Sequence, residues 1–194
     1  MKKLIRILAL ICIIAALTSS IAFAVVPFPT QPPLSQTFIV LPNKTYPSMA
    51  PMYASQSSST PMNRIAPFQE VYTADGSSAS ATWTASASNR WKFQYVKDGY
   101  DTSLIINTGY MHNDNLAPAS EMRVVNVGNG ALNLCSIAGD HSSGQGYLLS
   151  GALVLYVGTS NVSGWVKVRV FDTNDALFCN EFHVPASGLK AYSR

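Results

Sequence analysis

Short runs of β-branched and aromatic residues fill the chain after Pro67, and they constrain its fold more than any other feature. Gly, Asn, Asp and Ser separate these runs, which is the pattern of strands joined by short loops. No window of eleven residues there keeps apolar positions at helical spacing between capping residues. The runs are EVYTA, ATWTASA, RWKFQYV, SLIIN, MRVVNV, LLSGALVLYVG, GWVKVRVF and ALFCNEFHV. The sequence therefore predicts an all-β protein, built as a sandwich or as small barrels.

The first 24 residues have the composition of a signal peptide. A basic start, MKKLIR, precedes an apolar run, and Ala22–Ala24 fits the small-x-small rule for cleavage. Small polar residues close this run before it reaches the roughly 20 residues of a spanning helix, so we expect no retained membrane anchor. We expect cleavage after Ala24 and a secreted protein, either extracellular or periplasmic.

The charge of the chain argues against nucleic-acid binding. The formal net charge of +3 arises from 13 Lys and Arg residues against 10 Asp and Glu residues. Three of the basic residues, Lys2, Lys3 and Arg6, lie in the signal peptide, so the remainder is formally neutral. A neutral chain without a basic stripe lacks the electrostatic footprint of a nucleic-acid partner.

Proline content divides the remaining chain. Nine of the 11 prolines lie between Pro27 and Pro67, in a stretch with few charges and no periodicity. We expect residues 25–66 to form a Pro/Ser-rich spacer whose end overlaps the next segment. A β-rich segment then covers residues 67–118, and a second β domain covers residues 122–186.

The second β domain resembles the bacterial SH3-like domain, a five-stranded small barrel of exported cell-wall proteins. The family's ordered motifs match Leu132–Cys135, the loop Gly139–Gly146, Leu148, Gly151, Leu153–Val157, Gly164–Val168 and Phe178–Val184. Three family features are absent: Cys135 replaces an Arg, the following Gly-Pro is missing, and Phe178 replaces the last Trp. The resemblance implies a small SH3-like barrel and a ligand from the cell wall.

The segment before this domain has a similar order of motifs. Residues 110–116 match residues 178–184 in length and ending, and PMYAS at 51–55 echoes ALNLC at 131–135. Aligning the apolar faces of RWKFQYV and WVKVRVF places Arg90 opposite Trp165. Two interpretations stay open: a degenerate second SH3-like copy with an insertion, or a β segment of another kind packed on the C-terminal domain.

One exposed aromatic residue suggests a binding site. Alternation in SGWVKVRVFD puts three valines on one strand face and Trp165 on the other. In SH3-like barrels such a Trp helps to floor a groove beside the long loop. The resemblance thus implies a ligand-binding set of Trp165, Tyr147, Asp140, His141 and Gln145. The alternative is an ordinary surface aromatic.

Two cysteines remain after removal of the signal peptide. An even pair in an exported chain favours a disulfide, and the alternative is two buried thiols. The resemblance places Cys135 on the first strand and Cys179 on the last strand of one barrel. Because these strands lie close in the family, we expect a bridge between Cys135 and Cys179.

The sequence contains no residue pattern that indicates a catalytic site. His183 follows Cys179 by four residues, which is about 13 Å along a strand and too far for a nucleophile and its base. Asp140 and His141 lack a third partner or a metal-ligand spacing. We therefore expect no catalytic residues, no metal and no cofactor.

The leading hypothesis is an exported, non-catalytic binding protein whose partner is cell-wall peptide or glycan, as in peptidoglycan. The alternative is a structural or protein-interaction component of the cell surface, which docks a surface protein. A small secreted hydrolase is the least favoured of the three.

Overall fold

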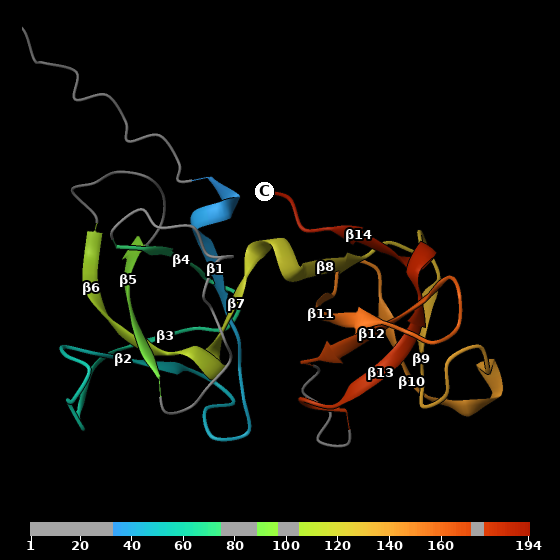
Figure 1. Ribbon diagram of the computed structural model, residues 1–194, viewed down its shortest axis with the longest axis horizontal. Helices are drawn as coiled ribbons and strands as arrows, with labels where there is room; N and C mark the ends of the chain where they lie inside the picture. The colour runs from blue at the N-terminus through green and yellow to red at the C-terminus, as the bar shows by residue number, and fades with distance from the viewer. Residues whose placement is uncertain (1–32, 75–88, 97–104, 172–176) are drawn as a thin grey trace, which may run out of the picture.

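The computed structural model describes residues 33–74, 89–96, 105–171 and 177–194. The described residues form 14 strands, and their helical residues lie only in short 3-10 turns, so the all-β prediction is confirmed. The strands make two antiparallel sheets of seven, which lie side by side (Figure 1). The predicted signal peptide lies outside the described residues.

The first sheet has the strand order β3-β2-β6-β5-β4-β1-β7. A 3-10 turn, η1 (Leu34–Gln36), precedes it, and another, η3 (Asn113–Asn115), separates β6 from β7. Its strands are β1 (Thr37–Val40), β2 (Ala50–Tyr53), β3 (Pro61–Ile65), β4 (Glu70–Thr73), β5 (Arg90–Val96), β6 (Ile105–His112) and β7 (Leu116–Pro118).

The second sheet has the strand order β10-β9-β13-β12-β11-β8-β14. Its 3-10 turns are η4 (Ala119–Glu121), η5 (His141–Ser143) and η6 (Ala186–Gly188). Its strands are β8 (Met122–Val125), β9 (Ala131–Cys135), β10 (Gly144–Leu149), β11 (Leu153–Thr159), β12 (Trp165–Val170), β13 (Glu181–Pro185) and β14 (Leu189–Ala191).

The two sheets repeat one topology. Each strand of the first sheet corresponds to the strand seven places later in the chain, and a 3-10 turn precedes the last strand of both. Arg90 pairs with His112, and Trp165 pairs with Pro185, immediately before these turns. Arg90 and Trp165 therefore occupy equivalent positions in two sheets of the same topology.

The structure corrects the expected boundaries. Residues 37–65 form β1, β2 and β3, so this part of the expected spacer is folded. Pro42 and Pro47 lie between strands and Pro61 begins the edge strand β3, which are positions that tolerate proline. Pro51 lies within β2, opposite Arg64 of β3, and the pairing of β2 with β6 begins only at Met52. The C-terminal domain also extends beyond residue 186, because β14 pairs with β8 at residues 189–191.

The closed SH3-like barrel is not confirmed. The hydrogen-bonded order of the second sheet leaves β10 and β14 at opposite edges among the described residues, and the first sheet leaves β3 and β7. The residues 183–189 (HVPASGL), and not 178–184, correspond to residues 110–116, since both segments end a strand and enter a 3-10 turn.

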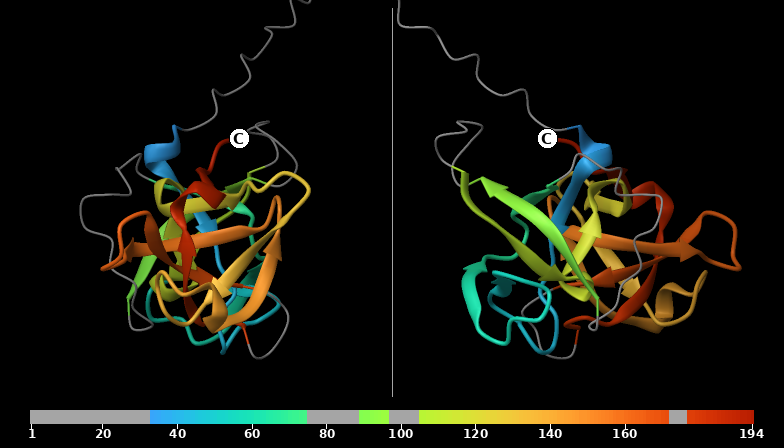
Figure 2. Two further views of the ribbon diagram at one scale, coloured as in Figure 1. Left: turned by 90° about the vertical axis from the view of Figure 1, so that its right-hand side faces the viewer. Right: turned by 60° about the vertical axis from the view of Figure 1, so that its left-hand side comes forward.

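Three apolar clusters hold the two sheets. One cluster lies within the first sheet around Phe38 and Phe93, and a second lies within the other sheet around Leu134 and Val168. The third joins the sheets, because it contains Ile39, Leu41 and Ala117 together with Met122, Leu155 and Phe171. In all three views the C-terminal end lies beside η1 of the first sheet (Figures 1 and 2).

The predicted disulfide is absent, since Cys135 and Cys179 are both free thiols. Cys135 lies opposite His183 in the pairing of β9 with β13. Cys179 lies before β13, four residues ahead of His183. Its thiol points instead to the carbonyl oxygen of Pro42, at 3.7 Å. The expected bridge was wrong because the two strands are paired in a register that separates the sulfurs.

Candidate binding site

The strand β12 has the two faces that its alternation predicts. Val168 and Val170 are fully buried, and Val166 packs against the same core. Gly164 adopts a left-handed φ of 77° at the turn before the strand, where Trp165 N donates to Val162 O at 3.1 Å. Trp165 faces the other side and is partly buried rather than fully open to water.

The long loop covers Trp165 with one of its own side chains. The imidazole of His141 lies over the indole of Trp165, with 5.0 Å between the ring centroids and 53° between the planes. His141 itself is exposed. Two of the five predicted residues thus form one aromatic surface, and the resemblance had placed them on the wall and floor of a groove.

Asp140 shapes the loop that carries His141. Its carboxylate accepts hydrogen bonds from Ser142 N at 2.8 Å and from Ser142 Oγ at 2.6 Å, which caps η5. These bonds lower the pKa of Asp140 below its usual value. The side chain is therefore ionised at neutral pH, and its hydrogen bonds hold the loop in place.

Gln145 and Tyr147 lie elsewhere, on the edge strand β10. They line a cleft of about 440 Å³ together with Leu149 and Leu177. Tyr147 is 61% exposed and Leu149 is 64% exposed. Since β9 and β13 separate β10 from β12 in the sheet, the five predicted residues form two neighbouring surfaces and not one pocket.

A hydrogen-bonded Ser–His pair lies beside the aromatic surface. Ser160 Oγ and His183 Nδ1 are 2.5 Å apart, and Cys135 lies across from His183 on β9. Sequence reasoning missed this pair because Ser160 and His183 are 23 residues apart and only the strand register joins them. Among the described residues no carboxylate orients the imidazole, so the pair lacks the third member of a hydrolase triad.

Charged side chains complete this face of the second sheet. Lys167 and Arg169 of β12 both contact Glu181 of β13, at 3.6 Å and 2.7 Å. The hydrogen bond from Arg169 lowers the pKa of Glu181, although partial burial opposes this. The two cations are therefore balanced in part by one carboxylate beside the aromatic surface.

Neither a metal site nor a membrane span is found in the described part of the chain. No three His, Cys, Asp or Glu side chains there gather to hold a metal ion. No helix among these residues is long and apolar enough to cross a bilayer.

Comparison with known proteins identifies no family. No family model matches the chain, and no curated protein matches it. Two solved structures, NlpC2 and NlpC1 from Trichomonas vaginalis, align with 81% of the chain at 8% and 9% identity. The TM-score is 0.29 for both, and the chain spans about half of their length, 48% of NlpC2 and 46% of NlpC1.

Proposed function

We propose that the protein is secreted and binds cell-wall peptide or glycan without catalysis, through the second sheet. The observation that carries this proposal is the contact of His141 with Trp165, which forms one accessible aromatic surface at the loop. The signal peptide expected from residues 1–24 supports export. The resemblance to SH3-like domains supports the class of ligand.

The chemistry of this surface suits a sugar ring or a peptide. Flat aromatic faces bind the apolar faces of such ligands, and a few fixed polar groups orient them. His183, Lys167 and Glu181 provide those polar groups on the adjacent strands. The Asp140 hydrogen bonds keep the loop ordered before the ligand arrives, which reduces the entropic cost of binding.

A second candidate function is docking of a surface protein on the edge strand β10. Ile137, Tyr147 and Leu149 are 59%, 61% and 64% exposed and lie on or beside this edge. An edge strand with apolar side chains can pair with an extended segment of another protein. This candidate uses a different surface from the aromatic one, so substitutions can separate the two.

Sedimentation with purified, insoluble peptidoglycan tests the proposal. The wild-type protein is expected in the pellet, and Trp165→Ala is expected to weaken binding at least tenfold because it removes the aromatic surface. Tyr147→Ser on β10 is the matched control and should bind as the wild type does. Retention of the Trp165→Ala variant in the pellet would contradict the aromatic site. Loss of binding in Tyr147→Ser alone would move the peptidoglycan site to the edge strand β10.

A further inference from the structure

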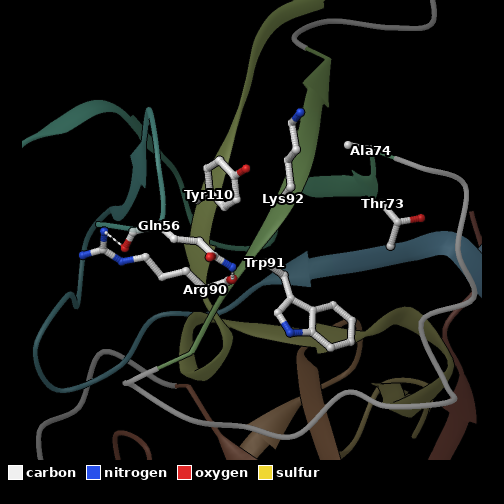
Figure 3. A pocket seen from close by; sticks show the side chains of 7 residues that line it. All are labelled: Gln56, Thr73, Ala74, Arg90, Trp91, Lys92 and Tyr110. Carbon is white, nitrogen blue, oxygen red and sulfur yellow. Dashed lines mark hydrogen bonds between the residues drawn. The ribbon is translucent and has the colours of Figure 1, made fainter. Parts of the chain in front are cut away.

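A cleft opens on the first sheet where β4 ends beside β5. It has a volume of about 330 Å³, and Gln56, Thr73, Arg90, Trp91, Lys92 and Tyr110 are among its lining residues (Figure 3). Among the described residues, the last backbone hydrogen bond that joins the end of β4 to β5 runs from Ala74 N to Lys92 O. The volume is within the range of small-molecule sites.

Arg90 builds this cleft and is not available to a ligand. Its guanidinium lies 3.5 Å from the centroid of the Tyr53 ring, and its Nε donates to His112 Nε2 at 3.1 Å. Its NH1 group donates to the backbone oxygens of Gln56 and Ser58, at 3.1 Å and 2.6 Å. Arg90 thus holds the loop between β2 and β3. Trp165, at the equivalent position of the second sheet, contacts His141 of the loop between β9 and β10.

Lys92 is the cation of the cleft that is available to a ligand. It is exposed, and within the described ranges it forms no ion pair and no side-chain hydrogen bond. Tyr110 pairs with it across β5 and β6, and Figure 3 shows the two side chains next to each other. The phenol of Tyr110 also has no hydrogen-bond partner within those ranges.

The equivalent lysine of the second sheet has an ion-pair partner. Lys167 occupies the position of Lys92, since Lys167 pairs with His183 as Lys92 pairs with Tyr110. Lys167 contacts the carboxylate of Glu181 at 3.6 Å. The position of Glu181, opposite Arg169, is taken in the first sheet by Thr108, opposite Gln94. Among the described residues, the first sheet therefore keeps the lysine but has Thr108 where the second sheet has the acid.

We propose that this cleft binds the carboxylate of a small organic ligand, with Lys92 as the ion-pair partner. Tyr110 donates its hydroxyl hydrogen to the ligand and offers its ring, and the side-chain amide of Gln56 borders the same space. One free ammonium group matches a singly charged carboxylate better than a phosphate dianion, which favours several cations. The shared chemistry fits an acidic sugar or the C-terminal carboxylate of a peptide.

Isothermal titration of the full chain with defined acids tests this inference. Glucuronate is the sugar probe and glucose its neutral control, while tri-alanine and its C-terminal amide are the peptide pair. At least one acid is expected to bind tenfold more tightly than its neutral control, and added salt should weaken that binding. The arm that binds identifies the source of the carboxylate. Equal affinity for acid and neutral control in both pairs, or no binding of either acid, overturns the inference.

Three substitutions locate the site. Lys92→Gln and Thr108→Glu should each weaken binding of the acid about tenfold or more, the first by removing the cation and the second by supplying the missing acid. Lys190→Gln, at an exposed lysine on the edge strand β14, is the control and should leave the affinity unchanged. Unchanged affinity in Lys92→Gln overturns the inference. This outcome is separate from the proposed peptidoglycan function, which Trp165→Ala tests on the other sheet.

Discussion

At the scale of single residues, side-chain alternation decides which residue supports the fold and which one is free to bind. Val168 is fully buried in the second core, whereas Trp165 lies on the opposite face against His141. Both positions lie on one strand, three residues apart, so local backbone effects are similar. Their difference in burial therefore separates stability from binding.

We expect Val168→Ala to cost more stability than Trp165→Ala. Truncating a fully buried valine removes packed methyl groups and leaves a small cavity, at a cost of about 1–3 kcal/mol. Trp165 is partly exposed, so its truncation opens the surface and creates no closed cavity. Urea denaturation gives the free energy of unfolding for both variants. An equal loss in the two variants would mean that Trp165 belongs to the core.

The two thiols should react with an alkylating reagent at different rates. Cys135 is fully buried, whereas Cys179 is partly exposed and packs against the apolar cluster between the two sheets. Burial raises the pKa of the Cys179 thiol, despite the nearby charges of Arg169 and Lys44, so its reaction should be slow at neutral pH. Mass spectrometry should find Cys179 modified first in the native protein and Cys135 only after unfolding. A bridged pair that resists alkylation would contradict the structure.

At the scale of elements, the pairing of β2 with β6 depends on a glycine, a residue without a side chain. A Cβ atom on Gly109 would lie 2.5 Å from Met52 Cγ and 2.9 Å from the backbone oxygen of Tyr53. Met52 is fully buried, and the carbonyl belongs to a paired strand, so neither neighbour moves away easily. This close approach allows β2 to pair with β6, next to the edge strand β3 of the first sheet.

Gly109→Ala should therefore destabilise the protein by about 1–3 kcal/mol, as overpacking of a buried site does. Gly158→Ala in β11 is the matched control, because a Cβ there meets nothing within 4 Å. We expect Gly158→Ala to melt at or near the wild-type temperature and Gly109→Ala to melt several degrees lower. Similar melting temperatures for the two variants would show that Met52 adjusts without cost.

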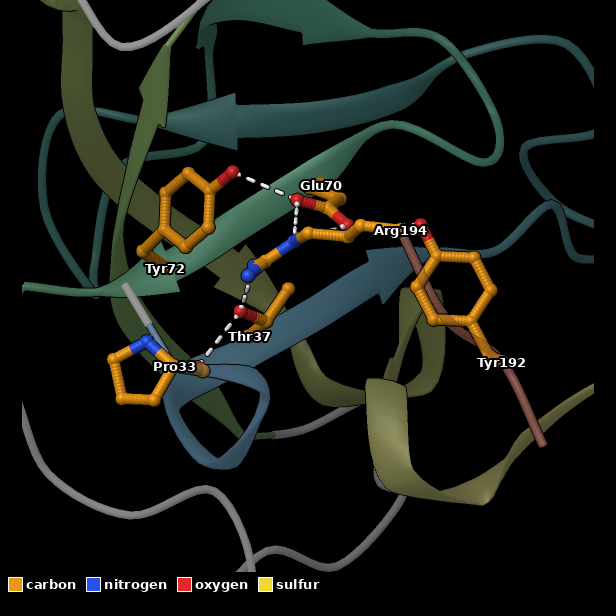
Figure 4. A network of polar contacts seen from close by, with 6 residues as sticks. All are labelled: Pro33, Thr37, Glu70, Tyr72, Tyr192 and Arg194. Carbon is orange, nitrogen blue, oxygen red and sulfur yellow. Dashed lines mark hydrogen bonds and ion pairs between the residues drawn. The ribbon is translucent and has the colours of Figure 1, made fainter. Parts of the chain in front are cut away.

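At the scale of the whole molecule, the C-terminal residues fasten the second sheet to the first. Arg194 Nε donates to both oxygens of Glu70 at 2.9 and 3.0 Å, and Tyr192 and Tyr72 each donate to the same carboxylate at 2.8 Å (Figure 4). Arg194 also donates to Thr37 Oγ1 at 2.6 Å. This network lies at the junction that the third apolar cluster fills.

The network should make stability depend on pH. Burial raises the pKa of Glu70, but the hydrogen bonds from Arg194, Tyr192 and Tyr72 outweigh it, and the pKa falls below its usual value. A lowered folded-state pKa adds stability above the unfolded value of about 4.3, and this contribution is lost as the pH falls through the folded value. Thermal melts from pH 7 to pH 3 should show a smaller acid-induced loss for Glu70→Gln than for the wild type. Parallel profiles would contradict this role of Glu70.

Residue patterns alone predicted much of the fold because they report local contacts. Alternation identified β12 and its buried valines, and composition identified an all-β chain. Aligning the apolar faces of two runs placed Arg90 opposite Trp165, and the strand pairing supports this. These inferences succeeded because a strand's period of two is visible in a few consecutive residues.

The tertiary structure alone decided how the strands pair. The expected disulfide failed because Cys135 faces His183, and the expected spacer failed because residues 37–65 pair with strands far along the chain. The same long-range pairing separates Tyr147 from Trp165 and joins Ser160 to His183. Among the described residues it also puts Thr108 where the second sheet has Glu181. The hydrophobic pattern of a strand decides which face is buried, but which distant strands pair, such as β1 with β7 or β9 with β13, depends on packing between segments far apart in the sequence.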